Sequence, residues 1–153
     1  PSWHLFCTLP VGGNKPMPIQ TPTILLVEDN PVDMEIMNVL LSPFYEVDSC
    51  LHGALALEML KHKNYDLLIS DIVMPVMGGI ELATVVGAHY PKIPVLIISN
   101  RSWEYHGYRE NYPNVKHWVN KPFKPSTLVG LVAGTIAENS PINYGNQTLD
   151  ETE

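Results

Sequence analysis

The chain of 153 residues carries nine Lys and Arg against sixteen Asp and Glu, a formal net charge of -7. Its hydrophobic content of 45% can form a buried core, which excludes wholesale disorder and fibrous classes. The negative charge, with no basic cluster, argues against direct nucleic-acid binding, and no apolar run approaches the ~20 residues of a bilayer span. The two cysteines, Cys7 and Cys50, fit neither a disulfide framework nor a zinc site, so we expect a soluble cytoplasmic domain without membrane contact.

The two ends of the chain differ in composition from its middle. Residues 1–22 hold five of the fourteen prolines, which favours an extended linker or the end of a preceding domain. Residues 140–153 are expected to form a polar C-terminal tail. The folded domain is therefore predicted over residues 23–139.

Strands and helices are predicted to alternate along this domain. Residues 24–27 form a short apolar run, typical of a strand buried on both faces. The next segment places Pro31 before apolar residues at helical spacing, namely Val32, Ile36, Val39 and Leu40, which indicates a helix. A second strand over 45–50 and a second helix over 54–61 follow.

The second half of the domain continues the pattern. Residues 67–69 and 95–98 are further apolar runs and predict strands, with a helix over 79–89 between them that stops before Pro91. Whether residues 100–112 form a helix is left open. A fifth strand precedes Lys121, and the last helix begins near Pro125 with an apolar stripe of Leu128, Leu131, Val132, Thr135 and Ile136. This order predicts an α/β fold with a doubly wound parallel sheet and helices on both faces.

Polar residues follow the predicted strands at their carboxyl ends, which meet at one sheet edge and form the usual ligand site of such folds. They are Glu28 and Asp29 after the first strand, then Asp71, Ser99 and Lys121. Three adjacent carboxylates repel one another unless a cation holds them, and Mg²⁺ prefers such oxygen ligands. Asp71 could attack a phosphoryl group, Lys121 could neutralise developing charge, and Ser99 could donate a hydrogen bond to a phosphoryl oxygen.

Each residue alone has a simpler explanation. Glu28, Asp29 and Asn30 could merely cap the first helix, and Asp71, Ser99 and Lys121 could be ordinary loop or surface residues. Their joint placement on one edge favours the shared phosphate and metal site.

The chain resembles the receiver domain of two-component response regulators over about residues 23–138. The resemblance rests on Ile24-Leu25-Leu26-Val27-Glu28-Asp29-Asn30, on Asp71-Ile72-Val73-Met74-Pro75-Val76-Met77-Gly78-Gly79, on Ser99, and on Lys121-Pro122-Phe123. It implies a flavodoxin-like sheet of five strands in the order 2-1-3-4-5.

The resemblance also implies the roles of single residues. Asp71 is the expected phosphoacceptor, and Glu28, Asp29, Asp71 and the main-chain carbonyl of Val73 are the expected Mg²⁺ ligands. Ser99 and Lys121 are expected to act on the phosphoryl group, with a cis peptide bond between Lys121 and Pro122. Ser99 and Trp118 are the expected switch residues.

By the same resemblance, the partners are a histidine kinase or phosphotransfer protein upstream and an output domain or phosphocarrier downstream. No enzyme activity is expected beyond self-phosphorylation and self-dephosphorylation. The chain departs from the family at Asn100, where Ala or Gly is usual, and Arg101 either reaches the phosphoryl group or points into solvent.

Residues 3–10, Trp3-His4-Leu5-Phe6-Cys7-Thr8-Leu9-Pro10, resemble the closing strand of a histidine kinase ATP-binding domain. This pattern suggests a receiver from a hybrid sensor kinase, which would place it in the cytoplasmic part of a membrane-bound sensor; an unrelated leader is the alternative. Two other functions compete. A receiver-like interaction module that is never phosphorylated is disfavoured by the intact acidic site, and an aspartate phosphatase of the haloacid dehalogenase type is disfavoured because Glu28-Asp29-Asn30-Pro31 lacks its motif.

Overall fold

The computed structural model describes residues 20–100 and 110–140. Its five strands form one parallel sheet in the order β2-β1-β3-β4-β5, which confirms the predicted doubly wound α/β fold. The elements in chain order are β1 (Thr23–Val27), α1 (Pro31–Leu41), β2 (Glu46–Cys50), α2 (Gly53–His62), β3 (Leu67–Asp71), α3 (Gly79–His89), β4 (Val95–Ser99), β5 (Val115–Asn120) and α4 (Pro125–Asn139).

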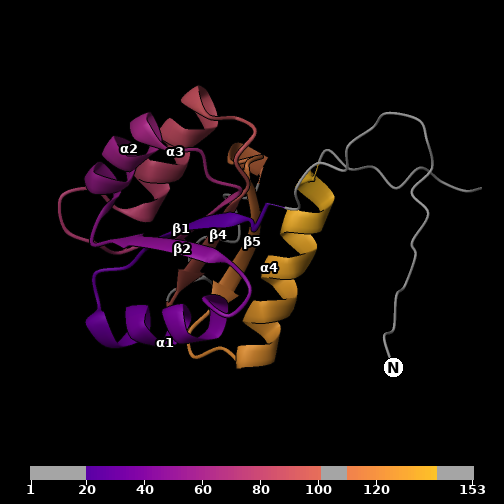
Figure 1. The fold of residues 1–153 in the computed structure, drawn as a ribbon. Helices are drawn as coiled ribbons and strands as arrows, with labels where there is room; N and C mark the ends of the chain where they lie inside the picture. The colour runs from indigo at the N-terminus through magenta and orange to yellow at the C-terminus, as the bar shows by residue number, and fades with distance from the viewer. Residues whose placement is uncertain (1–19, 101–109, 141–153) are drawn as a thin grey trace, which may run out of the picture.

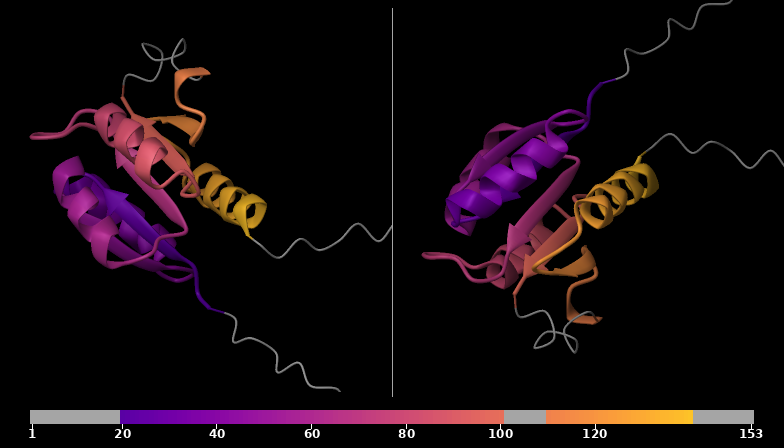
Figure 2. Two further views of the ribbon diagram at one scale, coloured as in Figure 1. Left: turned by 90° about the horizontal axis from the view of Figure 1, so that it is seen from above. Right: turned by 90° about the horizontal axis from the view of Figure 1, so that it is seen from below.

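The sheet is covered on both faces, as Figure 1 shows: α2 and α3 lie on one face, and α1 and α4 on the other. The views from above and below in Figure 2 show each helix pair in front of the sheet. Successive residues of β1 point to opposite faces, because side chains alternate along a strand. Leu25 and Val27 pack in the core under α2 and α3, while Ile24 and Leu26 pack in the core under α1 and α4. Burial on both faces explains why the central strands are continuous apolar runs.

Helix α1 forms where the sequence predicted it, but its apolar repeat does not face the core. Asn30 is its N-cap, and the Oδ1 atom accepts from the main-chain N–H of Val32 at 2.9 Å. The residues buried against the sheet are Met37 and Leu41. Three of the four residues that predicted the helix are exposed on its other side: Val32 (64%), Ile36 (46%) and Val39 (64%). The sheet covers only one stripe of the helix surface, and apolar residues outside that stripe stay exposed. Sequence spacing alone does not identify which stripe is covered.

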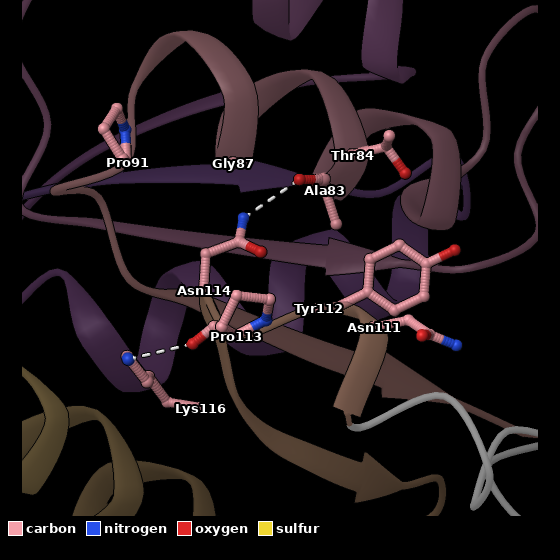
Figure 3. A pocket seen from close by; sticks show the side chains of 9 residues that line it. All are labelled: Ala83, Thr84, Gly87, Pro91, Asn111, Tyr112, Pro113, Asn114 and Lys116. Atoms are coloured by element: carbon pink, nitrogen blue, oxygen red, sulfur yellow. Dashed lines mark hydrogen bonds between the residues drawn. The ribbon is translucent and has the colours of Figure 1, made fainter.

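The start of β5 is fastened to α3 by a buried amide. Asn114 donates from Nδ2 to the main-chain oxygen of Ala83 at 2.9 Å, and a pocket of about 390 Å³ lies beside this contact (Figure 3). Gly87 faces the same amide, where a Cβ atom would come within 3.1 Å of Asn114 Oδ1. Lys116 donates to the main-chain oxygen of Pro113 at 3.0 Å. These contacts fix the strand that leads to Lys121.

The last helix confirms its predicted stripe: Leu128, Val132 and Thr135 of α4 are buried. The question of a helix over residues 100–112 falls mostly outside the described residues, as do the linker expected over 1–22 and almost all of the tail expected over 140–153. Within the two described ranges, no helix has the length and hydropathy that crossing a membrane requires.

Candidate functional site

Three carboxylates meet at the carboxyl edge of the sheet. Glu28 and Asp29 follow β1 directly, and Asp71 is the last residue of the neighbouring strand β3. One carboxylate oxygen from each residue lies within 4.8 Å of the others, close enough to hold a metal ion together. Glu28 is fully buried, Asp71 is half-buried and Asp29 is exposed. Such an oxygen-only donor set, partly open to solvent, fits the coordination chemistry of Mg²⁺.

Lys121 reaches into this cluster from the loop after β5. Its Nζ atom lies 2.7 Å from Glu28 Oε2, 2.9 Å from Asp33 Oδ2 and 3.1 Å from Asp71 Oδ2. The Lys121–Pro122 peptide bond is cis, as expected. The Lys121 N–H donates to the main-chain oxygen of Ser99 at 3.0 Å, which ties Lys121 to the end of β4. The ammonium therefore has a carboxylate for each of its three protons.

Burial and pairing act on the protonation of Glu28 and Lys121. Desolvation raises the pKa of Glu28 above its usual range, although hydrogen bonds from Lys121 and from the N–H of Asn30 oppose the rise. For Lys121, burial lowers the pKa, but the hydrogen bonds to Glu28, Asp33 and Asp71 outweigh it, and the pKa lies well above its usual range. Lys121 is therefore a permanent cation at the site.

A cavity of about 380 Å³ opens over Asp71. Its lining brings together most of the residues predicted from the sequence, and it is formed by Asp29, Asn30, Asp33, Asp71, Val73, Ser99, Asn100 and Lys121. Ser99 ends β4, the strand beside β3, so its side chain lies at the same edge as Asp71. Asn100, noted as a departure from the family, also borders this cavity, where a smaller residue would leave more room.

The loop after Asp71 approaches the strand closely. The N–H of Ile72 donates to Asp71 Oδ1 at 2.6 Å, and the N–H of Gly79 donates to the oxygen of Ile72 at 2.9 Å. A Cβ atom on Gly79 would overlap the main-chain oxygen of Asp71. This position therefore requires glycine, because the backbone folds back against the strand end that carries Asp71.

The sequence reasoning missed Asp33. This residue lies in the first turn of α1 and contacts Lys121, and its side chain is 34% exposed. The helix cap at Asn30 could have indicated it, because a helix that begins at the sheet edge has its first turn, and so Asp33, next to the site. Asp33 adds a carboxylate to the three that were predicted.

Among the described residues that were predicted for the site, Glu28 and Trp118 do not line the cavity. Trp118 lies in β5 and packs, partly buried, against the core under α2 and α3. It pairs with Ile97 in the register of β4 and β5, two positions before the pair of Ser99 and Asn120. Arg101 lies outside the described residues.

Comparison with known proteins gives a consistent result. The family model of the response regulator receiver domain matches residues 24–133. Hybrid signal transduction histidine kinase D of Dictyostelium discoideum is 31% identical over 113 residues, which cover 72% of this chain but only 7% of that kinase. The whole kinase is thus far longer than the matched region.

Two solved structures share the fold. The signal receiver domain of a signal transduction histidine kinase from Syntrophus aciditrophicus is 25% identical with a TM-score of 0.70, covering 86% of this chain and 95% of that one. The response regulator protein TrrA of Thermotoga maritima, in complex with Mg²⁺-BeF, is 28% identical with a TM-score of 0.64, covering 74% and 98%. With the family match, the five-stranded topology and the acidic site, this chain belongs to the response regulator receiver domains, the phosphoacceptors of two-component signalling.

Proposed function

We propose that Asp71 takes the phosphoryl group from a phosphohistidine. The observation that carries this assignment is that Asp71 lines the cavity, with Lys121 Nζ 3.1 Å from its Oδ2. One carboxylate oxygen of Asp71 forms the bond to phosphorus as the phosphorus–nitrogen bond of the donor breaks. The electron pair of that bond stays on the imidazole nitrogen. The ammonium of Lys121 then offsets negative charge on the transferred group.

The proposed Mg²⁺ ligands are Glu28, Asp29, Asp71 and the main-chain carbonyl of Val73. Support comes from the carboxylate oxygens within 4.8 Å of one another and from the Mg²⁺-BeF complex of the similar Thermotoga protein. When bound, the ion supplies charge neutralisation for the phosphoryl oxygens. The three carboxylates give the site its negative charge, and the exposed Asp29 leaves one side of it open to solvent.

The signal would pass from the site through Ser99. Phosphorylation adds about -1.5 to -2 charges and three acceptor oxygens. We propose that the Ser99 hydroxyl donates to one of them, and that Trp118, further back on the adjoining strand, repacks in response. The register that joins β4 to β5 supports this route. A full switch needs about 5.5 kcal/mol, more than one charge-assisted hydrogen bond provides, so Lys121 and Ser99 act together.

For partners, we propose a histidine kinase or phosphotransfer protein as donor, and an output domain or phosphocarrier as recipient. A phosphohistidine made from ATP places the domain in the cytoplasm. Similarity to the Dictyostelium hybrid kinase supports an origin within such a kinase. The pattern at residues 3–10 lies outside the described residues, so this origin is tested by the sequence that adjoins residue 1 in the full gene product.

The test of the phosphoacceptor is incubation with acetyl phosphate and Mg²⁺, followed by intact mass and peptide mapping. We expect one added phosphoryl group on Asp71, and none in Asp71→Asn or when EDTA is present. Asp66→Asn is the matched control, because Asp66 lies just before the first residue of β3, at the opposite edge of the sheet, and its carboxylate accepts from the Thr23 N–H at 2.8 Å. Labelling that persists in Asp71→Asn, or none in the unaltered chain, would contradict the proposal and favour a non-phosphorylated interaction module.

A further inference from the structure

Asp33 is held against Lys121 by the start of α1. The Asn30 side chain accepts from the Asp33 N–H at 3.2 Å, which fixes the backbone of this first turn. From there Oδ2 lies 2.9 Å from Lys121 Nζ, a shorter distance than the 3.1 Å to Asp71. The contact is therefore built into the cap of the helix.

This contact occupies a proton of Lys121 that a phosphoryl group needs. An ammonium has three N–H groups, and Glu28, Asp33 and Asp71 take all three. Glu28 is fully buried, whereas the Asp33 side chain is 34% exposed at the cavity wall. Asp33 is thus the partner that Lys121 can release at the lowest desolvation cost.

Asp33 also adds negative charge where the phosphoryl group must enter. Together with Glu28, Asp29 and Asp71 it makes four carboxylates at this edge of the sheet, three of which contact the ammonium of Lys121. One ammonium cannot neutralise all of these carboxylates, so the site keeps a net negative charge that repels an anionic phosphodonor, and the repulsion grows with the charge of the donor. Since Asp33 lies partly in solvent, this repulsion is moderated by water and screened by salt.

We propose that Asp33 is a positioning residue that holds Lys121 in the resting site and, through its charge, disfavours phosphodonors with a high negative charge. This inference rests on the proposed phosphorylation of Asp71. It assigns two separable effects to one side chain. The carboxylate oxygen accepts a hydrogen bond from Lys121 and positions it, and the negative charge repels an anionic phosphodonor.

Two substitutions separate these effects. Asp33→Asn removes the charge and keeps an oxygen that can accept from Lys121, whereas Asp33→Ala removes both. Glu35→Gln is the matched control, because it removes one charge from an exposed position of the same helix. Each variant of the 153-residue chain is phosphorylated at saturating Mg²⁺ with acetyl phosphate, a dianion, or with phosphoramidate, a zwitterion with one net negative charge.

We expect Asp33→Asn to raise the second-order rate constant for acetyl phosphate about three- to tenfold, and that for phosphoramidate about two- to threefold. The gain for acetyl phosphate should shrink as salt rises from low to near-molar concentration. Asp33→Ala should be about two- to fivefold slower than Asp33→Asn with both donors, because Lys121 loses a fixed acceptor. Glu35→Gln should change either rate constant by less than about 1.5-fold.

The outcomes distinguish this inference from the proposed function. If the unaltered chain is labelled on Asp71 but Asp33→Asn matches it with both donors, the charge effect is absent and the inference is wrong. Equal gains with both donors would also overturn it, as would equal rates for Asp33→Asn and Asp33→Ala, which would leave no positioning role. Failure to label Asp71 in the unaltered chain would overturn the proposed function and this inference with it.

Discussion

Glu28 and Lys121 are 93 positions apart in the chain, yet their side chains meet at 2.7 Å. Glu28 follows β1 and Lys121 follows β5, and the strands β3 and β4 separate these two in the sheet. The side chains are 0% and 8% exposed, so the pair is almost entirely removed from water. A buried ion pair contributes little net stability when intact, but the loss of one partner leaves an uncompensated buried charge.

Lys121→Met should therefore destabilise the fold strongly at neutral pH. We expect a loss of about 3–5 kcal/mol in the free energy of unfolding at pH 8, measured by urea denaturation. Without Lys121, the pKa of Glu28 in the folded state should rise further above its unfolded value of about 4.3. The folded state then binds the proton more tightly, so the loss should diminish as the pH falls through the raised pKa and vanish below the unfolded value.

The double variant Glu28→Gln with Lys121→Met should recover part of this loss, because no charge then remains unpaired at that position. Lys124→Met is the matched control: Lys124 is exposed three residues further on and makes no side-chain cap. A deficit in Lys121→Met that is the same at pH 5 and pH 8 would contradict the argument.

Gly79 and Gly130 predict opposite results for the same substitution. A methyl group on Gly79 would overlap the main-chain oxygen of Asp71, while nothing lies within 4 Å of a methyl group on Gly130 in α4. Gly79→Ala should lower the free energy of unfolding by about 1–3 kcal/mol through overpacking, and slow the phosphorylation of Asp71. Gly130→Ala should raise it by about 0.5–1 kcal/mol, since alanine is the better helix former. Thermal denaturation of both variants tests the pair, and a stable Gly79→Ala would show that the loop has room to move.

These residues also show which parts of the molecule the sequence could predict. The strands around Leu25 and Ile97 were predictable because burial on both faces leaves a continuous apolar signature. Asp71 and Lys121 were predictable because parallel topology alone brings strand ends to one edge. Asp33 was missed because its contact depends on the direction of a helical turn. The buried face of α1 was missed because the exposed residues Val32, Ile36 and Val39 recur at the same helical spacing that a buried stripe would show.

The loop between β3 and α3 contains a residue with an unusual backbone conformation, which hydrophobic periodicity in the sequence does not indicate. Val76 has φ of +66° and is the only non-glycine residue with positive φ among the described residues, and 80% of the residue is exposed. The Met77 N–H donates to the oxygen of Pro75 at 2.7 Å, which closes a tight turn around it. A β-branched residue is strained in this region, and glycine is not.

Val76→Gly should therefore be more stable than Val73→Gly by about 1–2 kcal/mol in urea denaturation. Both residues are exposed valines of one loop, so the entropy that glycine adds to the unfolded chain is the same in the two variants. Equal stabilities would mean that Val76 bears no strain.

The final prediction concerns Asp48, at the sheet edge formed by β2. Lys63 Nζ and the Tyr65 hydroxyl both donate to Asp48 Oδ2 at 2.8 Å. The hydrogen bond from Lys63 lowers the pKa of Asp48 most; burial opposes it, and Tyr65 adds to the lowering. A lowered pKa in the folded state means stability that is present above the unfolded value of about 3.9 and lost as the pH falls through the folded value.

Asp48→Asn should accordingly lower the free energy of unfolding at pH 7 by about 0.5–1.5 kcal/mol, with the difference from the unaltered chain closing below about pH 4. Glu46→Gln is the control, because Glu46 binds the same Lys63 at 2.7 Å but its side chain is 57% exposed. Solvent screening should limit its effect to about 0.5 kcal/mol. If the deficit of Asp48→Asn persists undiminished at pH 3, the stabilisation does not come from the charge of Asp48, since the protonated side chain would then still stabilise the fold better than the amide does.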